Sequence, residues 1–328
     1  MLPPQNSDLP ARLTALVGVL AIMAVAAMPW WAERATIFLA VEILAMLALA
    51  QMWNLLAGYG GLLSVGQQGF VGLGAYALVV FGLQAGLNAF LVVPLAGGVG
   101  ALAAVITAPL LFRLRGAHFA IGTWVVAEVF RLIVANLPMV SGGSGVSIAR
   151  TLTGMDVQWR TSLTLWWALA LGAGATGAVY ALLRSRWGLA LVAVRDSERA
   201  SQSLGVRVER IKWAVWVAAA AGCAMTGALL FITKLRVAPD PAFSIDWTTT
   251  MFFIVVIGGI GTLEGPIIGT IAYFVLREWL ADLGSIYLIL LGLITMAVML
   301  FFDRGLWGLI AQRTGWQLFP VRRRLVAE

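Results

Sequence analysis

Apolar runs of about 18 residues or more recur along this chain of 328 residues, and such runs are typical of helices that cross a bilayer. The composition agrees, because 61% of the residues are hydrophobic, only 11% are charged and the mean hydropathy is +0.93. Soluble domains carry about 25% charged residues. The sequence therefore predicts an all-α polytopic membrane protein with about eight to ten transmembrane helices, some of them short or broken by glycine.

The candidate spans follow one another through short connections. They cover residues 13–31, 36–56, 62–83, 88–112, 118–138, 161–183, 211–233, 247–261, 266–281 and 284–302. The first could be a cleaved signal peptide, but the aromatic "MPWW" after it and the immediate second run favour a retained helix. The eighth and ninth are short for crossing a core of about 30 Å, so they form either a re-entrant pair or two tilted helices.

The distribution of arginine and lysine predicts the orientation of the chain. One set of connections and termini holds 15 of these residues, and the opposite set holds 5. This positive-inside bias predicts two cytoplasmic termini. The chain then divides into a cytoplasmic N-terminus (1–12), a single transmembrane domain (13–302) with a cytoplasmic loop (184–212), and a basic cytoplasmic tail (303–328). Topology accounts for the net charge of +7, and we expect a lipid bilayer rather than nucleic acid as the surroundings.

Two glycine-rich segments interrupt this apolar sequence. They read "GYGGLLSVGQQGFVGLGAYA" (58–77) and "GGIGTLEGPIIGTIAYF" (258–274). Paired glycine-interrupted segments in two halves of a chain are a pointer to a transport site. We therefore expect a polar translocation path near Asn54, Ser64, Gly66, Gln67, Gln68, Gly69, Gly258, Gly259, Gly261 and Glu264. The alternative is that the glycines allow close helix packing and that the polar side chains bond buried helices together.

Glu42, Glu128 and Arg131 are charged residues that lie inside predicted spans. Glu42 stands alone in the second span, whereas Glu128 and Arg131 are three residues apart and share a face of the fifth. Intramembrane charges are functional candidates by default. For Glu128 and Arg131 a structural ion pair is slightly favoured over a role in a pathway, because a pair largely neutralises itself.

The 184–212 loop predicts a short exposed helix of about two turns. Asp196 or Ser197 can cap its N-terminus, Glu198 is favourable in its first turn, and Gly205 is a natural stop. The loop is either a solvated connector or a helix that docks onto a cytoplasmic partner. We favour docking, because topology alone does not need a capped helix.

The sequence argues against ATP hydrolysis and other enzymatic catalysis by this chain. It contains no G-x-x-x-x-G-K-[ST] phosphate loop, so energy for transport must come from a partner or from an ion gradient. The single histidine, His118, and the single cysteine, Cys223, are isolated, and no metal-ligand spacing occurs. A membrane enzyme is therefore disfavoured, and the open alternatives are the permease of an ATP-driven importer and an ion-coupled carrier or channel acting alone.

Four stretches resemble the LivM-type permease subunits of bacterial branched-chain amino acid ABC importers. They are "NLLAGYGGLLSVGQQGFVGLGAYA" (54–77), "FRLRGAHFAIGTWVVAEVFRLIVAN" (112–136), "GLALVAVRDSERASQSLGV" (188–206) and "VVIGGIGTLEGPIIGTI" (255–271). The resemblance implies a multi-pass protein of the bacterial inner membrane. It also implies a second homologous permease, two cytoplasmic ATPase subunits that carry ATP and Mg²⁺, and an external substrate-binding protein.

The same resemblance implies roles for residues of the 188–206 stretch. Arg195, Glu198, Ala200 and Gly205 match the segment that couples such permeases to their ATPases, whereas Asp196 and Ser197 depart from it. The external "SGGSGVS" (141–147) also departs from the family pattern. The implied substrate is a branched-chain or similar small zwitterionic amino acid, with urea or a short amide as the alternative.

Overall fold

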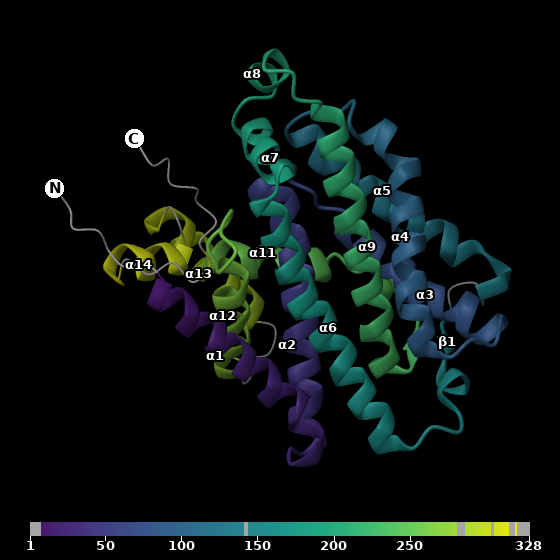
Figure 1. Cartoon of the computed structure of the whole chain (residues 1–328). Helices are drawn as coiled ribbons and strands as arrows, with labels where there is room; N and C mark the ends of the chain where they lie inside the picture. The colour runs from purple at the N-terminus through teal and green to yellow at the C-terminus, as the bar shows by residue number, and fades with distance from the viewer. Residues whose placement is uncertain (1–7, 141–143, 281–285, 303–304, 315–318, 320–328) are drawn as a thin grey trace.

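The described residues of the computed structural model are 8–140, 144–280, 286–302, 305–314 and 319. They are predominantly helical, which confirms the predicted all-α class (Figure 1). The main helices are α1 (Asp8–Ala26), α2 (Arg34–Asn54), α3 (Gln67–Ala77), α4 (Ala89–Leu111), α5 (Ala117–Asn136), α6 (Val157–Arg184), α9 (Val208–Lys234), α11 (Asp246–Gly258), α12 (Gly265–Leu280) and α13 (Ile286–Phe301).

Shorter elements join these helices. They are η1 (Met28–Trp30), the π-helical turns η2 (Leu55–Tyr59) and η3 (Leu78–Gln84), η4 (Pro138–Val140), η5 (Ala149–Leu152), α7 (Arg186–Asp196), α8 (Glu198–Ser203), α10 (Pro239–Ala242) and α14 (Gly305–Thr314). Two short strands, β1 (Val146–Ser147) and β2 (Arg236–Val237), pair antiparallel. The predicted tail (303–328) and N-terminus (1–12) fall largely outside the described residues.

Six helical segments within the described ranges are long and apolar enough to cross a membrane. A seventh is obtained if α13 and α14, which are bent by 44° relative to each other, count as one span. The remaining predicted spans correspond to shorter or broken helices, because α12 and α13 have 16 residues each and α3 has 11. The prediction of a multi-pass protein with short and broken helices is therefore confirmed.

The third predicted span, 62–83, is wrong in its first residues. Residues 61–66 are not helical, and α3 begins only at Gln67. The backbone here can leave helical geometry because neighbouring helices satisfy its polar groups. Trp53 Nε1 donates to the Ser64 carbonyl at 2.9 Å, and the Val65 amide donates to Thr123 Oγ1 at 3.0 Å.

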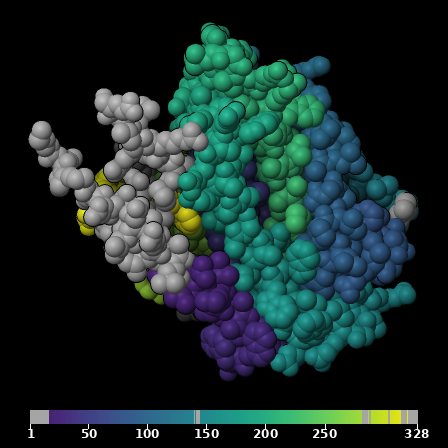
Figure 2. Space-filling model, in the orientation of Figure 1, coloured from purple at the N-terminus to yellow at the C-terminus, as the bar shows by residue number. Residues whose placement is uncertain are grey.

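Helix α9 forms the centre of the molecule, in contact with α2, α3, α4 and α6. It is rich in small residues between positions 218 and 228, which let neighbouring helices approach closely. A Cβ at Gly227 would overlap the backbone of α3 at Val71, and one at Gly74 would overlap the backbone of α9 at Ala224. On the face in Figure 2, the teal chain of α6 and the green chain of α9 lie side by side.

The molecule has two distinct ends. The loop end carries α7 and α8, and the strand end carries β1 and β2 (Figure 1). The turn after α4 belongs to the loop end, because Phe112 contacts Trp213 at the start of α9. The arginine-rich 184–212 segment and the turn with Arg113 and Arg115 therefore share one end, as the predicted topology requires. Which side of a membrane this end faces stays a prediction.

Candidate functional site

The two glycine-rich segments lie against each other near the loop end. Asn54, on the last turn of α2, joins them through its carboxamide. Its Nδ2 donates to the Thr262 carbonyl at 2.8 Å, and its Oδ1 accepts from the Gly261 amide at 2.9 Å. A Cβ at Gly58 would overlap both the Asn54 side chain and the Gly261 backbone. Each glycine-rich segment contains a break in its helix, and the backbones of the two breaks are in direct contact. We call this contact the glycine seam (Asn54–Gly61 against Gly258–Gly265).

Each break ends where a new helix begins. The second break turns through Gly259 (φ +128°) and Gly261 (φ +73°), a backbone conformation that side-chain-bearing residues rarely adopt. Glu264 lies immediately before α12, and it is 6% exposed. Its Oε1 accepts from the Phe319 amide at 3.0 Å.

The remaining glycines of the predicted site mediate close packing. Gly66 and Gly69 face Thr123 and Ala127 on α5 so closely that an added Cβ would overlap them. Gly258 lies in the same way against Gly265 at the crossing of α11 and α12. Close helix packing thus explains why glycine, rather than a larger residue, stands at these three positions.

Ser64, Gln67 and Gln68 are almost completely buried. Gln67 Nε2 donates to Ser64 Oγ at 3.2 Å, and Gln67 Oε1 accepts from Cys223 Sγ on α9 at 3.4 Å. Gln68 Oε1 accepts a hydrogen bond from Thr248 Oγ1 on α11. These side chains bond α3 to its neighbours in this conformation, and their role in lining a path stays a prediction.

Arg195 connects the 184–212 segment to the glycine seam. It lies at the end of α7, and its Nη1 donates to the Gly58 carbonyl at 2.9 Å. Its Nη2 lies 3.0 Å from Asp196 Oδ1. Arg195 also packs against Gly61 and lies close to Gly261. Arg195 therefore contacts both breaks.

The predicted short helix is present as α8. Ser197, rather than Asp196, caps its N-terminus by accepting from the Ala200 amide at 3.3 Å. Glu198 follows in the first turn and forms an ion pair with Lys212 of α9. Gly205 ends the helix with φ +81°. The sequence did not predict α7, which precedes α8 in the same connection.

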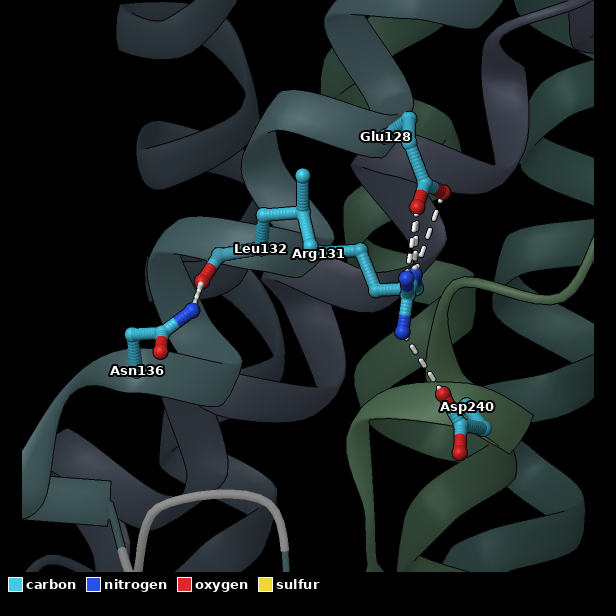
Figure 3. Close-up of polar contacts among 5 residues, drawn as sticks. All are labelled: Glu128, Arg131, Leu132, Asn136 and Asp240. Carbon is cyan, nitrogen blue, oxygen red and sulfur yellow. Dashed lines mark hydrogen bonds and ion pairs between the residues drawn. The ribbon is translucent and has the colours of Figure 1, made fainter.

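The intramembrane charges are paired. Glu128 Oε1 lies 2.6 Å from Arg131 Nη2, and Asp240 Oδ1 lies 2.8 Å from Arg131 Nη1 (Figure 3). Glu42 Oε1 lies 2.6 Å from Arg277 Nη1 and joins α2 to α12. The Glu128–Arg131 pair is as expected, whereas the partners Asp240 and Arg277 were missed because they lie more than 100 residues away in the sequence.

Among the described residues, no three His, Cys, Asp or Glu side chains are grouped so that they could hold a metal ion.

The comparison with protein families identifies the chain. The model of the branched-chain amino acid transport system permease component matches residues 34–302. The chain belongs to this family. A permease of this kind is a multi-pass membrane protein and not an enzyme.

Individual relatives agree with this membership. The high-affinity branched-chain amino acid transport system permease protein LivM of Escherichia coli is 29% identical over 313 residues, covering 88% of this chain and 73% of that protein. LivM of Salmonella typhimurium is 28% identical, covering 88% and 74%. A probable LivM of Methanocaldococcus jannaschii is 22% identical, covering 50% and 48%. No solved structure was found to match the chain.

Proposed function

We propose that this permease and a second, homologous permease form the translocation path of an ATP-driven importer for branched-chain or similar small zwitterionic amino acids. Two ATPase subunits, which carry ATP and Mg²⁺, act at the loop end, and a substrate-binding protein docks at the strand end. The names of the relatives support this substrate class. Urea or a short amide is the alternative substrate.

The observation that carries the proposal is the hydrogen bond from Arg195 to the Gly58 carbonyl. α7 and α8 are the elements that an ATPase would push, because they are exposed at the loop end and bear arginines. Leu204, at the end of α8, is 82% exposed and offers an apolar contact to such a partner. Arg195 would carry the displacement to the glycine seam. The opening and closing of the path then follow from a change in how α2, α3, α11 and α12 pack.

The first experiment is the isolation of the tagged chain from its native membranes in mild detergent, with identification of its stoichiometric companions. We expect a second hydrophobic permease and subunits with a phosphate loop. The complex is then reconstituted with its binding protein, and ATP-dependent uptake of leucine, urea and acetamide is compared. Recovery of the chain alone, with uptake driven by an ion gradient, would contradict the proposal and favour a stand-alone carrier.

A further inference from the structure

Three charged side chains meet on the outward face of α5. Arg131 lies between Glu128 and Asp240 and forms an ion pair with each (Figure 3). The surrounding face of α5 is apolar and exposed, with Ile121 at 58% and Trp124 at 49%. Charged groups in membrane-spanning segments face other protein or a water-filled cavity, because exposure to lipid is costly. This face of α5 is therefore expected to border a polar space in the assembled protein.

The three charges line a hollow of about 260 Å³. Its other lining residues are Trp124, Phe243, Ser244 and Ile245. The hollow thus combines ionic groups with an aromatic and aliphatic lining. Ligand pockets commonly combine an apolar lining with a few polar groups that fix the orientation of the ligand, so this lining suits a small molecule with a charged head and an apolar body.

The charge balance of the trio favours an added cation. Two carboxylates face one guanidinium, and the Asp240 side chain is 86% exposed, so it retains capacity to accept hydrogen bonds. Arg131 has not used all its donors either. Its Nε and Nη2 donate to Glu128 and its Nη1 donates to Asp240, whereas a guanidinium carries five N–H groups. The carboxylates of the hollow can therefore accept hydrogen bonds from an ammonium group, and its guanidinium can donate hydrogen bonds to a carboxylate.

We propose that this hollow is a binding site for a zwitterionic aliphatic amino acid. Asp240 and Glu128 bind its ammonium group, and the remaining N–H groups of Arg131 bind its carboxylate. Trp124, Phe243 and Ile245 contact its side chain. This assignment rests on the proposed transport function and gives the path a substrate site on the face of α5 that lies apart from the glycine seam.

The test is protection of a single reactive thiol from alkylation in the purified permease–ATPase complex. Ile245→Cys places a thiol in the hollow, and the only native cysteine of this chain, Cys223, is fully buried. The chain is labelled with a maleimide in the presence of L-leucine, isopentylamine (ammonium only) or 4-methylpentanoate (carboxylate only). The extent of labelling is measured by mass spectrometry. We expect leucine to slow labelling most, the amine to slow it partly, and 4-methylpentanoate to have no effect.

The variant that tests the charges is Asp240→Asn, which is exposed enough to leave helix packing intact. Loss of one charged partner is expected to raise the leucine concentration for half-protection by about 10-fold or more. Glu33→Gln removes an exposed carboxylate from another part of the strand end and should leave protection unchanged.

Two results would overturn the assignment. One is equal protection by all three compounds, and the other is leucine protection that Asp240→Asn leaves unaltered. If ATP-driven leucine uptake is intact while leucine gives no protection, the site is wrong although the proposed function holds. If the complex takes up no amino acid at all, the proposed function itself fails.

Discussion

At the scale of single residues, the glycine seam depends on two side chains. Asn54 satisfies one amide and one carbonyl of the second break, and Arg195 satisfies one carbonyl of the first. Buried backbone groups without partners are costly, so these side chains determine whether the breaks can persist in a membrane. Asn54 lies between two breaks of the same chain, whereas Arg195 comes from an exposed connection. Their substitutions should therefore have different effects.

Asn54→Ala is expected to destabilise the fold. It leaves the Gly261 amide and the Thr262 carbonyl without their partner, and because both bonds are partly buried the expected cost lies toward the lower end of about 1–3 kcal/mol for each group. The measurement is thermal unfolding in detergent. Asn136→Ala is the control, because Asn136 is exposed and, among the described residues, its side chain donates to Leu132 of its own helix alone. Equal melting temperatures for the two variants would contradict this account of the seam.

Arg195→Gln is expected to impair coupling rather than stability. The side chain is 37% exposed, so its loss leaves no buried cavity, but the link to Gly58 is broken. In reconstituted importer we expect ATP hydrolysis to continue while uptake per ATP falls. Arg199→Gln, an exposed arginine in the first turn of α8, is the matched control. Normal uptake per ATP in the Arg195 variant would remove Arg195 from the coupling route.

At the scale of elements, α7 and α8 form a short rigid unit between two long helices. Ser197 caps α8 at one end, and Gly205 ends it at the other with positive φ. The ion pair between Glu198 and Lys212 also ties α8 to α9. α8 is thus held at its N-terminus, at its C-terminus and against α9, as the proposed coupling role would require.

Gly205→Pro should abolish uptake while the complex still assembles. Proline requires φ near −65°, and it also removes the bond from the Gly205 amide to the Gln202 carbonyl. Co-purification of the ATPase and uptake are measured together. Gly86→Pro imposes the same backbone strain before α4 and should retain uptake, because Gly86 (φ +72°) lies away from the 184–212 segment. Wild-type uptake by the Gly205 variant would contradict the coupling role.

Local features of these elements could be predicted from the sequence, and contacts between elements could not. The glycine-rich segments indicated breaks, and the cap of α8 and the Glu128–Arg131 pair follow from residues a few positions apart. The junction of Gly58 with Gly261 joins residues about 200 apart, and the pairing of Glu42 with Arg277 spans 235 positions. A single sequence contains no periodicity or spacing that reports such distances. The burial of Gln67 and Gln68 likewise depends on helices packed from both halves of the chain.

At the scale of the whole molecule, the arginines divide the protein into two ends. The loop end bears the 184–212 segment and the turn after α4, and the strand end bears Arg150, Arg160 and Arg236. The excess at the loop end predicts that this end is cytoplasmic. Under the proposed function, the orientation decides which end would meet the ATPase and which end would meet the binding protein.

Single cysteines at the two ends test this orientation. Gln202→Cys lies on α8 and Gln158→Cys lies at the start of α6, and both positions are exposed. With the chain expressed without the ATPase, an impermeant maleimide should label position 202 only in inverted vesicles and position 158 only in right-side-out vesicles. The reverse pattern would mean that the loop end is external.

The glycine seam also limits how this molecule can evolve. Side chains at most helix contacts can be exchanged for others of similar volume. The sequence of a packed interface can therefore change during evolution while its total side-chain volume is kept. A methyl group at Gly58, Gly258, Gly265 or Gly269 would overlap backbone atoms, and at Gly58 and Gly265 it would overlap a side chain as well. No neighbouring replacement can make room for it without moving a helix. In a library of random variants, we expect functional sequences to keep glycine at these four positions. Substitutions should accumulate instead at positions on the outward faces of the helices.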